Sequence, residues 1–134
     1  SHITFDGCGA PLFLISMRGL ASAFHKFATS KDPVHQQVIN ACLTYPEMVA
    51  GEGRLDTELM KRVPDLFLKV GAEGVQAACL RDGRTVVFKV SDGSERAHDV
   101  ILQKAFAKLG FNFDVNPLQV LGGGEKIGEL RAAN

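Results

Sequence analysis

The segment "DGCGAP", Asp6–Pro11, combines residue types that could do chemistry. It places a carboxylate two positions before the thiol of Cys8, with one glycine on each side of that thiol. Glycines let a ligand or another stretch of backbone approach closely. Cys8 could therefore act as a nucleophile, as a metal ligand or as a small buried apolar residue. The structural alternative is a turn that precedes a helix and buries the thiol.

The segment "KVGAEG", residues 69–74, is a second cluster with charged side chains between glycines. Lys69 follows an apolar run, and a lysine held in apolar surroundings can act as a base. The alternative is a strand-end lysine that reaches solvent. Gly71 and Gly74 fall where a strand should continue, which often marks the close approach of a ligand. We expect them to leave the strand edge bare for a substrate.

The segment "VAGEGR", residues 49–54, is the third cluster. Arg54 and the backbone N–H groups of this glycine-rich turn could bind an anionic group. The alternative is a loop that carries a surface arginine.

The chain contains no complete catalytic constellation. No serine is followed three positions later by lysine, and the patterns GxSxG, HExxH and CxxC are absent. The three cysteines, Cys8, Cys42 and Cys79, are odd in number, which favours a reducing cytoplasm over a disulfide framework. Cys42 and Cys79 lie in periodic apolar stretches and are expected to be inert core thiols.

Length and charge bound the kind of protein further. The 134 residues fit a single domain, 1–134, and Lys+Arg and Asp+Glu number 15 each, so a nucleic-acid partner is not expected. The sequence has no apolar run long enough to predict a membrane span and no signal-peptide pattern. Residues 1–2, Ser-His, are interpreted as a possible tag remnant.

Periodicity predicts helices first, then strands, then a helix and short tail strands. Asp82-Gly83 is a strong hairpin signal, and Asp56 and Ser94 are candidate helix caps. The histidines on helical segments, His25, His35 and His98, are expected at the surface. The fold class is therefore α+β, an antiparallel sheet with a central hairpin at about 66–90 packed against helices. The predicted elements are helices over 12–27, 33–45, 55–63 and 94–110, strands over 66–80 and 84–90, and two short strands over 117–132.

Three clusters in this order, "DGCGAP…RGLASAF", "PEMVAGEGRLDTELM" and "KVGAEGVQAACL", resemble the later half of the L-asparaginase II family of the thermolabile Rhizobium type. The resemblance runs from about Phe5 to the end and includes "GEKIGELR". It implies a fold like the later part of serine β-lactamases and glutaminases. It also implies hydrolysis of L-asparagine to L-aspartate and ammonia through a serine–lysine acyl-enzyme mechanism.

The resemblance also implies roles for individual residues. Lys69 matches a catalytic lysine of the family, and Cys8 matches one ligand of a zinc site near the active centre. Asp6 would contact the substrate ammonium group or support the metal site. The residues assigned to substrate binding are Asp6, Arg54, Gly71 and Glu73.

The family's SxxK pair, its second serine and its "CGKH"-like segment are missing from this sequence. They belong to the early half of the family, so we interpret the chain as the C-terminal part of a larger enzyme, inactive without that half. A partial domain should expose apolar surface and form homo-oligomers. The alternative is a non-catalytic α+β module that binds a small ligand or a partner protein.

Overall fold

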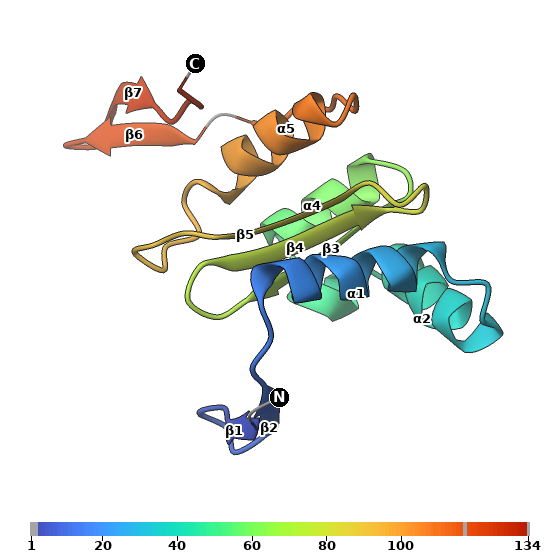
Figure 1. Ribbon diagram of the computed structural model, residues 1–134. Helices are drawn as coiled ribbons and strands as arrows, with labels where there is room; N and C mark the ends of the chain where they lie inside the picture. Colours follow the sequence, from blue (N-terminus) through green and yellow to red (C-terminus); the bar gives the residue numbers. More distant parts are fainter. Residues whose placement is uncertain (1–2, 117, 134) are drawn as a thin grey trace.

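A three-stranded antiparallel sheet in the order β3–β4–β5 lies at the centre of the molecule (Figure 1). The computed structural model describes residues 3–116 and 118–133, so residues 1–2, which we interpreted as a tag remnant, lie outside it. The strands are β3 (Leu66–Gly71), β4 (Val75–Leu80) and β5 (Thr85–Lys89).

The strand register assigns side chains to the two faces of this sheet. Phe67 pairs with Cys79, whereas Gln76 pairs with Val70 on one side and Phe88 on the other. Because side chains alternate along a strand, Phe67 and Cys79 share one face and the remaining three share the opposite face.

Helices cover both faces (Figure 1). On one face Phe24 of α1 stacks on Phe67, and Phe27 of α1 packs tilted against the same ring. On the other face α4 packs against β3 and α5 against β5. The helices are α1 (Met17–Thr29), α2 (Pro33–Thr44), α3 (Glu47–Ala50), α4 (Leu55–Arg62) and α5 (His98–Lys108).

The hydrophobic core lies between the sheet and these helices. Leu59 of α4, Leu68 of β3 and Phe106 of α5 are completely buried. Two further rings, Phe111 and Phe113, pack edge-on against Phe106. The predicted α+β fold with an antiparallel sheet against helices is confirmed.

The boundaries of α2 agree with the sequence, but those of α1 and α5 differ. Asp32 caps α2 by accepting a 2.8 Å hydrogen bond from the Val34 N–H. The predicted helix over 12–27 instead begins after Ser16, whose hydroxyl caps α1, because residues 11–13 pair as a strand. Ser94 does not cap α5, which begins four residues later.

The sequence predicted one strand over residues 66–80, and this was wrong. The chain reverses at Ala72–Gly74, with φ of 59° at Glu73 and 71° at Gly74. Glycine adopts positive φ without strain, so Gly74 is placed where the turn requires it. The predicted central hairpin is therefore a three-stranded meander.

Two short hairpins lie outside this body (Figure 1). The first joins β1 (Ile3–Phe5) to β2 (Pro11–Phe13), and the second joins β6 (Gln119–Gly122) to β7 (Glu125–Glu129), as predicted for the tail. Among the described residues, no helix has the length and apolar character needed to cross a membrane.

Candidate functional site

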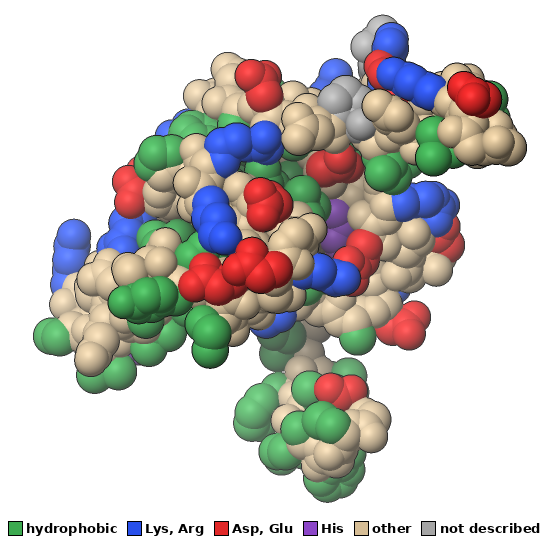
Figure 2. All heavy atoms as spheres, turned by 180° about the vertical axis from the view of Figure 1, so that it is seen from behind, with side chains coloured by type: hydrophobic (Ala, Val, Ile, Leu, Met, Phe, Trp, Pro, Cys, Tyr) green, Lys and Arg blue, Asp and Glu red, His purple; other side chains and the backbone are tan. Residues whose placement is uncertain are grey.

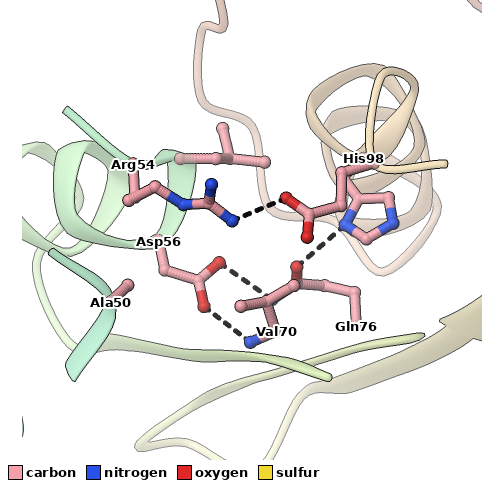
Figure 3. Close-up of a pocket in the computed structure, with 8 residues that line it drawn as sticks. Ala50, Arg54, Asp56, Val70, Gln76 and His98 are labelled. Carbon is pink, nitrogen blue, oxygen red and sulfur yellow. Dashed lines mark hydrogen bonds and ion pairs between the residues drawn. The ribbon is translucent and has the colours of Figure 1, made fainter. Parts of the chain in front are cut away.

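A buried chain of three polar side chains connects α4, β4 and α5 (Figure 3). Asp56 is 2% exposed, Gln76 0% and His98 1%. The Gln76 Nε2 group donates to Asp56 Oδ1 at 3.0 Å, and the other end of the same amide meets His98 Nδ1 at 3.1 Å. A second donor, the Val70 N–H, lies 2.7 Å from Asp56 Oδ2. Buried polar groups of this kind require such partners, so the chain fixes how the three elements pack.

The direction of these hydrogen bonds sets the tautomer of His98. Gln76 Oε1 can only accept, so the neutral imidazole carries its proton on Nδ1. Nε2 is buried and has no hydrogen-bond partner within the described part of the chain.

Burial affects the two titratable groups of this chain in opposite directions. Desolvation raises the pKa of Asp56 above its ordinary value, although the Val70 N–H, Gln76, and the charges of Lys69 and His98 act against it. Desolvation lowers the pKa of His98, although Glu95, the Gly74 backbone and two aspartates act against it. In both cases the low-polarity surroundings favour the neutral form.

A small cavity opens beside this chain, bordered by an ion pair (Figure 3). Arg54 Nη2 and Glu95 Oε2 are 2.8 Å apart at its wall. The cavity volume is about 40 Å³. That space suits water, whereas ligand sites for small organic molecules are typically about 300 Å³ or larger. Arg54, predicted to bind an anionic group, forms this ion pair with a carboxylate of its own chain.

Lys69 lies on the opposite face from this cavity, and its side chain is exposed. Its ammonium group donates to the Val70 carbonyl at 2.7 Å, at the outer edge of β3. The solvent-reaching alternative for this lysine is therefore the one observed. A hollow lined mainly by Phe24, Phe27 and Phe67 adjoins it.

The other predicted substrate-binding residues near Lys69 belong to the β3–β4 turn. Gly71 ends β3, and Glu73 follows in the turn with its carbonyl accepting from Lys89 Nζ at 2.6 Å. The edge that we expected to be bare is occupied at Val70, because the Asp56 carboxylate and the Lys69 ammonium bind its N–H and C=O groups.

Asp6 and Cys8 lie in the exposed β1–β2 hairpin, away from all of these residues (Figure 1). Asp6 accepts from the Gly7 N–H at 2.7 Å, and Cys8 Sγ lies 3.9 Å from the second carboxylate oxygen. The alternative of a buried thiol is thus wrong. Within residues 3–116 and 118–133 no three His, Cys, Asp or Glu side chains could hold one metal ion. A zinc site needs about four ligands, so the residues present do not fit zinc by themselves.

The sequence did not predict the positions of the three hydrogen-bonded side chains of the buried chain. Asp56 was expected to cap α4, but it lies in the first turn and points to the sheet. His98 was expected at the surface and is buried, whereas His25 and His35 are exposed as predicted. Gln76 was not singled out, although a glutamine in the apolar strand "VQAACL" signals a buried polar partner.

These features define an α+β protein with a solvent-facing lysine on the edge strand of an antiparallel meander. Its family follows from comparison with known proteins: the family model described as L-asparaginase II matches residues 1–131. The chain belongs to the L-asparaginase II family and is thus related to asparaginase-type amidohydrolases. No individually curated protein matches the chain.

Proposed function

We propose that this chain takes part in hydrolysis of the side-chain amide of L-asparagine to L-aspartate and ammonia, as the C-terminal part of a larger enzyme. The observation that carries the proposal is the family match across residues 1–131. The exposed position of Lys69 at an edge strand supports it, since a group that faces solvent is available to a substrate or to another segment.

The chemistry would follow acyl transfer. A serine outside this sequence, deprotonated by a neighbouring lysine, attacks the amide carbonyl carbon, and the C–N bond breaks to release ammonia. Water then hydrolyses the ester and regenerates the serine. Lys69 would carry a proton or support the serine pair, and Gly71 and Glu73 next to it would contact the substrate. Asp6 and Arg54 lie away from Lys69 in this chain, so they would contact the same substrate only after a rearrangement in the complete enzyme. Without SxxK this chain would be inactive alone.

Zinc enters this proposal only as a shared ion of the complete enzyme. Cys8 would supply one thiolate, and the remaining ligands would come from the early half. Because the described residues do not fit zinc by themselves, we derive no catalytic step from it.

The exposed apolar side chains support association. In the β1–β2 hairpin Ile3, Phe5 and Phe13 are each at least 64% exposed, and Figure 2 shows hydrophobic side chains gathered on this projecting hairpin. Patches of this kind mark interaction surfaces, so we expect binding to the early half and formation of homo-oligomers. The free cysteines of the described chain support a reducing, cytoplasmic location.

Ammonia release from L-asparagine, measured for this chain combined with the early half, tests the proposal. Replacing Lys69 by alanine should lower kcat by at least about a hundredfold, the usual contribution of a positioned proton-transfer group. Lys31→Ala, which changes another exposed lysine, should leave kcat unchanged. Near-normal turnover of the Lys69 variant would remove its assigned role. If both halves are soluble and associated but release no ammonia, the non-catalytic binding module becomes the better reading.

A further inference from the structure

The two edge groups of Val70 are bound by side chains of opposite charge. Its N–H donates to Asp56 Oδ2 at 2.7 Å, and its C=O accepts from Lys69 Nζ at 2.7 Å. β3 is an edge strand, so no neighbouring strand competes for these groups among the described residues. Figure 3 shows the Asp56 carboxylate directed at Val70.

The Val70 N–H belongs to the peptide group that follows Lys69. Since a peptide group is planar, the hydrogen bond to Asp56 fixes the orientation of the backbone directly after the Lys69 Cα atom. The Val70 carbonyl then holds the other end of the lysine side chain. Lys69 is thus restrained at its backbone and at its ammonium group through one residue.

Asp56 is suited to act as the fixed end of this arrangement. It is 2% exposed, in contrast to the exposed lysine. Its second oxygen accepts from Gln76, which is itself held by His98. A buried carboxylate with two N–H donors has little freedom to move, because any displacement leaves polar groups unpaired.

The charges around Asp56 link it to Lys69 as well. Desolvation raises the pKa of Asp56 most, and the Val70 N–H, Gln76 and then the charges of Lys69 from β3 and His98 from α5 act against it. Arg54 and Glu95, in the same cavity wall, form an ion pair with each other. The charge of Lys69 therefore lowers the pKa of the Asp56 carboxyl, against the larger effect of burial.

We propose that Asp56 is a positioning residue for Lys69, acting through the Val70 peptide from the opposite side of the sheet. The inference rests on the catalytic role proposed for Lys69. Asp56 touches neither substrate nor reacting atoms in this proposal; it sets the direction in which the lysine is presented.

An NMR titration of the unmodified chain is the first test. As Asp56 is protonated, the Val70 amide proton and the Lys69 Cε resonance should shift with the same midpoint as the Asp56 carboxyl carbon. If both resonances remain unchanged while the carboxyl titrates, the proposal is overturned. This measurement requires neither activity nor a variant that folds.

Three variants give the second test. Asp56→Ala should speed hydrogen exchange of the Val70 amide at least tenfold. Asp56→Asn has one oxygen that can accept from the Val70 N–H but no second acceptor for Gln76 Nε2, so it should restore part of the protection. Glu58→Ala, an exposed carboxylate in the same helix, is the matched control and should behave as the unmodified chain. Unchanged Val70 exchange in a folded Asp56→Ala chain would overturn the proposal.

The third measurement uses the assembled enzyme. Asp56→Ala should lower kcat at least tenfold with KM within about twofold, and Asp56→Asn, which can still accept from the Val70 N–H, should recover part of the loss. A loss shared equally by both variants, or confined to KM, would contradict positioning. If the unmodified assembly releases no ammonia, the proposed function fails, while the NMR measurements still decide whether Asp56 holds Lys69.

Discussion

The β1–β2 hairpin and the buried chain of Asp56, Gln76 and His98 both place a carboxylate beside hydrogen-bond donors, but the partners differ in range. The Asp6 carboxylate binds only neighbours one and two positions away, Gly7 and Cys8, and both are exposed. Asp56 contacts groups 14 and 20 positions away, and it is buried. The hairpin is therefore a local structure, whereas the buried chain exists only when three separate elements have packed.

This difference explains why one region was conspicuous in the sequence and the other was not. A cysteine between two glycines attracts attention because its neighbours are adjacent in the chain. Long-range partners leave no such pattern. The hairpin presents exposed groups with local contacts, whereas the buried chain ties the strand that carries Lys69 to α4 and α5.

Thiol reactivity should give the largest contrast between exposed and buried regions. Cys8 is exposed, whereas Cys79 is completely buried and burial raises its pKa to about 12. Because thiolate is the reactive form, Cys79 should react with a thiol reagent at least about a thousandfold more slowly than Cys8 in the folded chain. Mass spectrometry of timed alkylation checks this, and comparable rates would show that the core opens readily.

Replacing Asp56 and Asp6 in turn should affect the stability of the fold to very different extents. Asp56→Ala leaves the half-buried Val70 N–H and the buried Gln76 Nε2 donor without their acceptor, which should lower the free energy of unfolding by about 2–4 kcal/mol. Asp6→Ala should leave the urea midpoint unchanged, since its contacts are exposed and local. Urea denaturation of both variants measures the difference. An equal loss from the two would mean that the hairpin is also part of the cooperative unit.

The smallest of the expected effects is the change in the free energy of unfolding with pH. Burial lowers the pKa of His98 below 6.5, so the unfolded chain binds more protons than the folded chain between the two values. Stability should therefore fall as the pH drops through this window, by at most about 1.4 kcal/mol per pH unit. Asp56 has the opposite effect: because its pKa is raised, the folded chain binds more protons at that carboxyl, and this contribution to stability grows as the pH drops toward 3.8.

A histidine comparison isolates that contribution. His98→Gln should flatten the slope in urea denaturation curves recorded between pH 7.5 and 5, whereas His35→Gln, at an exposed position, should retain it. If the pH dependence of stability disappears in the His35 variant and persists in the His98 variant, the effect does not come from His98.

The fold could be predicted well wherever the signals are local. Asp32-Pro33 defined the start of α2, and the apolar runs with Asp82-Gly83 located the central sheet. Prediction failed at Ala72–Gly74, because a turn between two apolar strands looks like one strand when its neighbours are unknown. It failed again at residues 11–13, which pair with a strand six positions or more upstream.

The same distinction between local and long-range signals applies to the candidate site. By itself the sequence determined the fold class, the extended character of the segment that carries Lys69, the thiol motif and the family resemblance, because each is written in contiguous residues. Only the tertiary structure decided that Lys69 faces solvent, that Asp56 turns inward to hold the Val70 peptide, and that His98 is buried. The physical reason is that burial and hydrogen-bond partners of a polar side chain depend on which distant segments pack against it, and residue type alone does not specify this.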